Sequence, residues 1–474
     1  MVPASPVGAA ERPAGPDTAR AGAGAEPAAP ARGPQTAEAE QTTRTERTTG
    51  AAKAATRRTN TRTVPVVFVH GHEGSAQQWQ SQAKRFSSNG YPDRLLYAFE
   101  YNTRVPTDDH AVAGLEEFVD GVRARTGAPR VDVIAHSRGT RVLHRYLSVP
   151  ERAAEVRKYV NLDGASSAER PGGVPTLAIW GSAQPNGSIG GAVNVHTTDQ
   201  GHTETATSAR SFAHIHTFLR GRAPATEKVL PEPPGQVEIA GRAVHFPLNS
   251  GLAGRLEVWR LDPATGARAD RRPRHVVRTG ADGAFGPLDV NGRHTYELVL
   301  VRPGERVNHF YPEPFERSDR FVRLLVSAPG GVADRADACP GHTSVTVVRN
   351  REWWADTAAP DADRLELNGV QVLNPAVSPA SRQILGVFAF DRDCDGISHT
   401  EAPLPPFDRI PFLTATDLHL PASPAADGTI TVTQTMRGTG GERRTLAVRN
   451  WPSDSDTVSV LFKDYTDTAF GSTR

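Results

Sequence analysis

The sequence VDVIAHSRG occupies residues 131–139, and it begins with the apolar, β-branched residues that form a buried strand. The run ends at Ser137, which has small residues two positions before and two positions after it, Ala135 and Gly139. A serine on the tight turn between a strand and a helix has a strained backbone, and small neighbours relieve the close contacts. The pattern therefore indicates a nucleophilic serine, with Ala135 where glycine is more usual.

A second stretch with the same form lies upstream, VPVVFVHGHEG at residues 64–74. An apolar run that enters a glycine-rich loop is typical of a buried parallel strand whose carboxyl end opens onto a site. This loop and the residue after the serine are the places from which backbone N–H groups reach an oxyanion. We therefore expect His72 and Arg138 to form an oxyanion hole with their backbone N–H groups.

Short apolar runs alternate with helical patterns over residues 63–222, which predicts an α/β domain with a mostly parallel sheet flanked by helices. The expected strands lie at residues 64–69, 95–99, 131–135, 159–162, 176–180 and 192–196. The expected helices lie at residues 76–89, 108–126 and 138–148, and apolar residues recur at helical spacing in the second of them.

Three blocks in this region carry a resemblance: VVFVHG at residues 66–71, VDVIAHSRG, and KYVNLDGASS at residues 158–167. In this order they resemble the bacterial and archaeal α/β-hydrolases of the triacylglycerol lipase and esterase family. The chain also resembles a larger archaeal lipase type, in which a hydrolase domain precedes a β-rich region. The resemblance implies an α/β-hydrolase fold, an ester or lipid small molecule as substrate, and no required cofactor.

In this fold the catalytic residues follow the order serine, acid and histidine, and the histidine lies in the loop after the last strand. His202 fits this place, because residues 196–204 leave an expected strand and enter a helix near Thr205. His214 and His216 fall inside that helix, where we expect surface or packing roles. His202 is therefore the predicted base.

The acid has two candidates. The usual place in the family follows the strand at residues 176–180, but Gln184 and its neighbours there hold no carboxylate. Asp163 ends the preceding strand, and the larger lipase type takes its acid from that point, so we assign the acid to Asp163. Asp199 is the alternative, although a residue only three positions from His202 more often forms a turn.

Trp79 lies close after the oxyanion loop, and it either lines an acyl pocket or packs a helix against the sheet. The connection at residues 101–111 is short and polar, so no lid is expected there. A site without a lid would favour soluble or short esters; in the alternative arrangement, the following domain supplies a lid or an apolar rim.

The composition changes after the hydrolase region. Residues 223–235 are rich in proline and charge and read as a linker. Residues 236–330 show short alternating strands and turn pairs, which predict a β-sandwich. The pattern GADGAFGPL at residues 280–288 resembles transthyretin-like or carboxypeptidase-regulatory modules. Residues 331–474 are expected to form a second β-rich (sandwich- or barrel-like) domain that binds acyl chains.

The C-terminal region contains one metal-like motif. Asp391, Asp393 and Asp395 stand at alternate positions before Gly396, as at the opening of a calcium loop. The glutamate expected at the twelfth loop position is missing, because Ala402 stands there. A structural calcium and a solvated acidic turn are therefore both open interpretations.

The chain has 474 residues, of which 38% are apolar, enough for two or three domains. Its formal net charge of +1 lacks the basic excess of nucleic-acid-binding proteins, and it has no apolar run long enough for a membrane span. Cys339 and Cys394, the two cysteines, form one disulfide or stay as thiols.

Residues 1–62 are rich in alanine, proline, threonine and charge, so we expect a disordered tail. Residues 1–6 offer no apolar core of a signal peptide. We nevertheless expect a secreted or extracellular protein, with a cytoplasmic one as the alternative.

The sequence thus predicts a serine carboxylester hydrolase, a lipase or esterase that forms an acyl-enzyme on Ser137 and touches lipid surfaces transiently. The alternatives are a non-catalytic binding or cell-surface module that retains the fold, and a polyester depolymerase or amidase. The number of subunits is left open.

Overall fold

The computed structural model describes residues 63–358 and 361–466, so the predicted disordered tail at residues 1–62 lies outside the described residues. The described residues fall in one unit by their contacts. Among them, no helix is long and apolar enough to span a bilayer.

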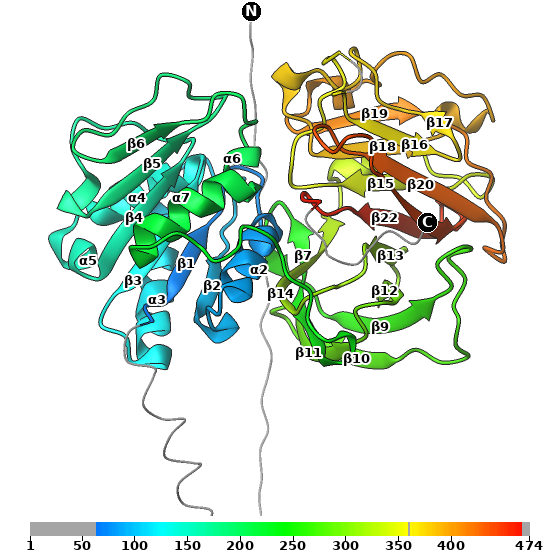
Figure 1. Cartoon of the computed structure of the whole chain (residues 1–474). Helices are drawn as coiled ribbons and strands as arrows, with labels where there is room; N and C mark the ends of the chain where they lie inside the picture. The colour runs from blue at the N-terminus through cyan, green and yellow to red at the C-terminus, as the bar shows by residue number, and fades with distance from the viewer. Residues whose placement is uncertain (1–62, 359–360, 467–474) are drawn as a thin grey trace, which may run out of the picture. The chain divides into compact units, whose positions relative to one another are not determined.

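The hydrolase region is built on a six-stranded sheet of order β2-β1-β3-β4-β5-β6 in which all neighbouring strands are parallel (Figure 1). Its strands are β1 (Val66–Val69), β2 (Leu96–Phe99), β3 (Val131–His136), β4 (Val156–Leu162), β5 (Thr176–Trp180) and β6 (Val193–His196). All six expected strands are present, and this confirms the predicted α/β-hydrolase fold. The strands β1, β3 and β5 are fully buried, as expected for a parallel sheet covered on both faces.

Helices cover both faces of this sheet. They are η1 (Ala76–Trp79), α2 (Gln80–Ser88), η2 (Asp93–Leu95), α3 (Asp109–Thr126), α4 (Arg138–Leu147), α5 (Pro150–Ala154), η3 (Pro171–Gly173), α6 (Glu204–Thr207) and α7 (Ala209–Arg220). Apolar residues of α3 and α4 pack with Val67 and Val69 of β1 on one face. Residues of α2 and α7 pack with Val66 and Phe68 on the other. Successive side chains of β1 therefore point to opposite faces of the sheet and pack into two separate cores.

The remaining described residues form three β-sheets, which confirms the predicted β-rich region. A four-stranded sheet contains β11 (Ala284–Val290), β7 (Val237–Phe246), β14 (Asp319–Ser327) and β8 (Ser250–Gly251). A second four-stranded sheet contains β17 (Val370–Gln371), β16 (Arg364–Leu367), β20 (Thr429–Thr435) and β21 (Arg443–Arg449). The largest has eight strands: β10 (His275–Thr279), β9 (Gly254–Leu261), β12 (Thr295–Val301), β13 (Val307–Pro312), β22 (Asp456–Leu461), β15 (Val345–Val348), β18 (Gly386–Phe390) and β19 (Leu413–Asp417).

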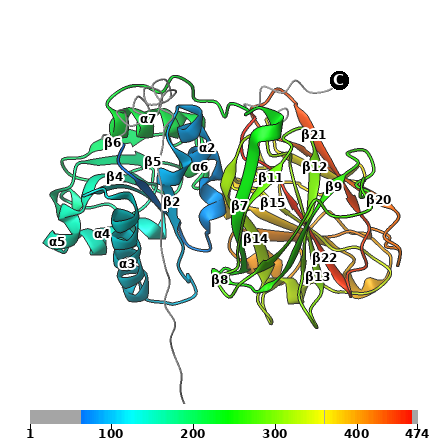
Figure 2. The same cartoon turned by 90° about the horizontal axis from the view of Figure 1, so that it is seen from below.

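The eight-stranded sheet joins the two β-rich regions that the sequence presented as separate domains (Figure 2). Strand β22, near the end of the chain, lies between β13 and β15 and is parallel to both, so that Ser459 stands between Phe310 and Thr346. The last strand thus fills a place between strands from both predicted regions, and the division between residues 330 and 331 stays a prediction. Turn signals and local alternation report strands, but they do not report which distant strand each one joins.

Strand β14 attaches the β-rich region to the hydrolase region. Its Phe321 packs edge-on against Phe68 of β1, with 5.9 Å between the ring centroids. Arg323 pairs with Glu100 at 2.8 Å, and both side chains are buried. The apolar contact and the buried ion pair hold β14 beside η1 and α2, next to the loop that follows β1.

Candidate active site

Ser137 occupies the turn between β3 and α4 with a positive φ of 52° and a ψ of −124°. Few non-glycine residues adopt such a backbone conformation, and it turns the side chain outward at the end of the strand. The turn is crowded: a Cβ at Gly139 would lie 2.5 Å from the carbonyl oxygen of His70, and one at Gly71 would lie 2.8 Å from the Cβ of Ser137. The small residues around the serine are therefore required by sterics.

The structure brings Asp163 and His202 together, 39 positions apart in the chain. The imidazole Nδ1–H of His202 donates to Asp163 Oδ2 at 2.8 Å. The other carboxylate oxygen accepts the backbone N–H groups of Gly181 at 2.8 Å and Gln184 at 3.1 Å. The loop that lacks the usual acid thus supplies two backbone donors to Asp163, which is 1% exposed.

Asp199 lies elsewhere. Its side chain is 71% exposed, and both of its oxygens accept from one nitrogen of Arg210 at 2.8 Å. His216 is buried in α7, where its Nδ1–H donates to the carbonyl oxygen of Arg222 at 3.0 Å. Asp199 thus forms a surface ion pair, where the sequence suggested a turn residue, and His216 has the packing role that the sequence suggested.

His136, the residue before the serine, is a site residue for which the sequence indicated no role. Its Nε2–H donates to the backbone carbonyl oxygen of His202 at 3.0 Å, and its Nδ1 accepts from Gln78 at 2.8 Å. Burial, followed by the nearby His202, lowers the pKa of His136 well below its ordinary value, so the ring stays neutral. A neutral ring with one donor and one acceptor matches these two partners.

The two expected oxyanion donors flank the serine turn differently, because Arg138 follows Ser137 directly in the chain and His72 belongs to the loop after β1. Arg138 is the first residue of α4, where a backbone N–H has no acceptor within its own helix. The Arg138 side chain points away and ties down the loop before α3, donating to Asp108 at 2.8 Å and to the carbonyl oxygen of Thr103 at 2.7 Å. His72 lines the cavity beside Ser137.

The loop after β1 is also held from the β-rich region. Asn249, in the turn between β7 and β8, donates to the carbonyl oxygens of Gly74 at 2.9 Å and Tyr101 at 3.1 Å. Asn249 is 6% exposed, so water offers these carbonyl groups little alternative. The position of the loop therefore depends on a residue outside the hydrolase region.

A cavity of about 410 Å³ extends from this site into the β-rich region. Ser137 and His202 line one part of it. Its apolar wall includes residues of two downstream sheets: Phe246 and Leu325 of the sheet with β7 and β14, and Phe310, Val348, Phe388 and Leu461 of the eight-stranded sheet. The apolar rim therefore comes from the following domain, one of the two arrangements that the sequence left open.

Trp79 does not line this cavity, so the suggested acyl-pocket role needs correction. Its side chain is fully buried and stacks on Phe68 with 5.1 Å between centroids and an angle of 26°. It ends η1 with its ring against the sheet, because that face of β1 needs an apolar cover. Trp79 is a core residue.

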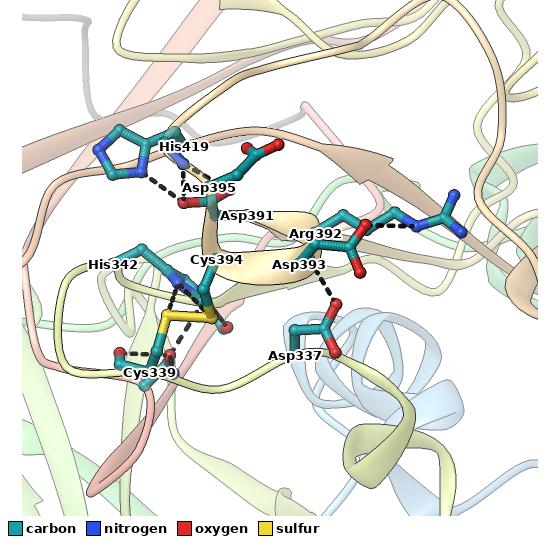
Figure 3. Close-up of a disulfide and its surroundings, with 12 residues drawn as sticks. Asp337, Cys339, His342, Asp391, Arg392, Asp393, Cys394, Asp395 and His419 are labelled. Carbon is teal, nitrogen blue, oxygen red and sulfur yellow. Dashed lines mark hydrogen bonds and ion pairs between the residues drawn. A yellow bond between two sulfur atoms is a disulfide. The ribbon is translucent and has the colours of Figure 1, made fainter.

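The acidic motif near the C-terminus forms a tight turn (Figure 3). Asp391 accepts from Nδ1–H of His419 at 2.7 Å and from the backbone of Gly396 at 3.0 Å, and Asp395 accepts from the backbone of Ile397 at 2.8 Å. Asp393 lies on the other side of the turn beside Arg392. The carboxylates serve different partners, and the calcium site stays a prediction.

Cys339 and Cys394 are joined in a disulfide beside this turn, so the disulfide alternative holds in the structure (Figure 3). His342 Nδ1 lies 2.8 Å from the sulfur of Cys339. Among the described residues, Cys339, His342 and Cys394 form a group whose possible metal-ligand atoms lie within 4.8 Å of one another. The two sulfur atoms are bonded to each other in the disulfide, so they are not free to bind a metal.

Family models match most of the described chain. A model described as Lipase (class 2) matches residues 63–153, and one described as Lipase C-terminal domain matches residues 235–329. A third, described as a C-terminal domain, matches residues 331–466. Together these matches support a lipase family with a C-terminal extension. The serine turn and the loop after β1 lie inside the first match, and Asn249 lies inside the second.

The matches to similar solved structures cover about a third of this chain. A gene product of Listeria innocua is 13% identical, with 35% of this chain and 96% of that chain covered and a TM-score of 0.27. Lipase B of Aspergillus fumigatus is 14% identical, with 35% and 54% covered and a TM-score of 0.28. An epoxide hydrolase of Vigna radiata is 14% identical, with 34% and 92% covered and a TM-score of 0.26.

Proposed function

We propose that this chain is a serine carboxylester hydrolase, a lipase or esterase in which Ser137 is the nucleophile. The observation that carries the proposal is the 2.8 Å hydrogen bond between His202 and buried Asp163, beside a serine with a strained turn conformation. Ser137 and His202 line one cavity, so a bound ester can meet both. A nucleophile, a base and a group that orients the base are the parts that this chemistry needs.

The proposed reaction begins when His202 Nε2 removes the proton of the Ser137 hydroxyl as the oxygen attacks the ester carbonyl carbon. Asp163 holds Nδ1–H, which leaves Nε2 free to accept that proton, and it stabilises the imidazolium that forms. The oxyanion lies between the backbone N–H groups of His72 and Arg138, each of which lowers the barrier by about 3 kcal/mol. The alcohol leaves with the proton from His202, and water activated by His202 then releases the acid.

The cavity supports an acyl ester as the substrate class. Its walls are mainly apolar, and burial of each methylene group contributes about 0.8 kcal/mol. A chain that enters from Ser137 would pass between β14 on one side and β15, β18 and β22 on the other. We therefore propose that the downstream region binds the acyl chain, and that transient contact with a lipid surface delivers it. The disulfide also supports the proposed secretion, because disulfides persist in oxidising compartments.

Covalent labelling tests the proposal. A fluorophosphonate probe should label the wild-type protein and should fail to label Ser137→Ala, with Ser188→Ala, a serine outside the cavity lining, as the control. A series of p-nitrophenyl esters should show kcat/KM rising from acetate toward decanoate. Folded wild-type protein that takes no label and turns over no ester would favour the non-catalytic module instead.

A further inference from the structure

The loop that carries His202 is fastened from outside the hydrolase region. Glu352, on the connection after β15, accepts the backbone N–H of Thr203 with one oxygen and that of Glu204 with the other at 3.1 Å. These two N–H groups follow directly after His202, at the start of α6, where a helix has no acceptors of its own. One carboxylate from the C-terminal region thus replaces the water that would otherwise bind them.

The loop is shaped to admit this carboxylate. A Cβ at residue 201 would lie 2.3 Å from an oxygen of Glu352, so glycine is the residue that allows the close approach. Glu352 itself is fully buried. On the hydrolase side, the carbonyl oxygen of His202 accepts from His136 at 3.0 Å and from the hydroxyl of Thr205 at 2.7 Å. The backbone around His202 is therefore held by hydrogen bonds from both the hydrolase region and the C-terminal region.

The segment around Glu352 is itself rigidly supported. Arg349, fully buried, donates to the carbonyl oxygen of Glu352 at 2.7 Å and pairs with Asp363 at 3.0 Å. Arg437 pairs with the same Asp363 at 2.7 Å and with Glu204 at 2.6 Å. This last pair connects the support back to the loop of His202. Buried charged groups that share partners resist displacement, because moving one leaves the others unpaired.

We propose that Glu352 is a positioning residue for the catalytic histidine, so that the C-terminal region completes the active site of the hydrolase. The inference rests on the proposed function, since it assigns His202 as the base. Glu352 acts through the two peptide N–H groups after His202. Without its carboxylate these groups must turn toward other acceptors, and a displacement of about 1 Å at a catalytic group is enough to lower the rate about 100-fold.

Full-length Glu352→Gln is the main test. Glutamine keeps the shape but has one acceptor oxygen, so its NH₂ group faces one of the two N–H groups. We expect kcat on a p-nitrophenyl ester to fall about 100-fold with KM nearly unchanged, because the acyl cavity stays intact. Glu352→Asp, which keeps two acceptors on a shorter stem, should recover part of kcat. The matched control is Glu366→Gln, another buried glutamate of the same region, paired with Arg443.

A second variant guards against a folding defect in the first. Gly201→Ala keeps the Glu352 side chain but forces the loop and the carboxylate apart, whichever of the two moves, so it should lower kcat in the same way. Circular dichroism and Tm establish that each variant is folded at the assay temperature. If Glu352→Gln fails to fold, Gly201→Ala decides: folded protein with wild-type kcat and wild-type amide exchange in this loop overturns the proposal.

A readout that needs no turnover separates this proposal from the proposed function. The proton between His202 and Asp163 gives a low-field ¹H NMR signal, which Asp163→Asn assigns by removing it. In Glu352→Gln this signal should broaden or shift, and the amides of Thr203 and Glu204 should exchange faster. An unchanged signal with unchanged exchange overturns the proposal, even if kcat falls. An inactive wild-type protein refutes the ester hydrolase, while the signal and the exchange still decide the role of Glu352.

Discussion

Asp163→Asn is the most informative single substitution in the proposed triad. The Asp163 carboxylate accepts one bond from His202 and two from the fixed backbone N–H groups of Gly181 and Gln184. Asparagine has one acceptor oxygen, and two backbone donors at 2.8 and 3.1 Å compete for it against one side chain. The oxygen should therefore turn toward the backbone, which leaves the NH₂ group facing His202.

This geometry fixes the size of the effect. An NH₂ group facing Nδ1 makes that nitrogen the acceptor, so the proton of the neutral imidazole moves to Nε2, the atom that must receive the serine proton. The wrong tautomer lowers kcat about 10⁴-fold, which corresponds to about 5.5 kcal/mol in activation free energy. The exposed Asp199 offers the matched control, because Asp199→Asn removes only a surface ion pair with Arg210.

The assay is kcat and kcat/KM on p-nitrophenyl butyrate, together with the rate of fluorophosphonate labelling at Ser137. Asp163→Asn should slow both, and Asp199→Asn should leave both within about twofold. If Asp199→Asn abolished turnover while Asp163→Asn retained it, the acid would have to be reassigned and the reasoning from the hydrogen bonds would fail.

Two other substitutions probe the contacts that surround the site. Asn249→Ala should lower kcat about 10-fold and speed amide exchange in the loop after β1, because two buried carbonyl groups lose their donor. Unchanged amide exchange in this loop would contradict the role of Asn249. His309 lies between Glu297 and Asp456. Burial lowers the pKa of His309, but the hydrogen bonds and charges of these two carboxylates outweigh burial and raise it. The contribution of His309 to stability is therefore present at low pH and is lost as pH rises through the raised pKa. Urea unfolding of wild type and His309→Gln should therefore differ more at about pH 5.5 than at about pH 9, and an equal difference would contradict the assignment.

The sequence was sufficient for the parts of the fold that local patterns determine. The strand before Ser137 ends where its apolar run ends, and the turn needs small residues for a reason that the sequence already shows. Asp163 was preferred to Asp199 because the larger lipase type that the chain resembles takes its acid from this strand end, and the structure places Asp163, and not Asp199, against His202. The first inference rests on chain neighbours, and the second rests on the resemblance.

The remaining site residues were beyond local patterns. Asn249 and Glu352 reach the site from 175 and 149 positions away, measured to Gly74 and Thr203. A lone asparagine in a turn or a lone glutamate after a strand has no signature, because surface residues of these types are common. His136 stood inside the quoted motif, but its role depends on the hydrogen bond from Gln78. Gln78 lies in a segment that the sequence predicts as helical, where a polar residue is expected to face solvent.

The placement of β22 explains why the downstream region is suited to carry site residues. A strand from the end of the chain, inserted between β13 and β15, ties both β-rich regions into one sheet, and β14 fixes that region to the hydrolase through Phe321 and Arg323. Glu352 follows β15 by a few residues, so the register of β15 on β22 determines where its carboxylate lies. A short buried link between a sheet and a catalytic loop transmits position well, because close-packed interiors deform little. The same sheet that lines the cavity beside Ser137 thereby sets the position of His202 in the proposed mechanism.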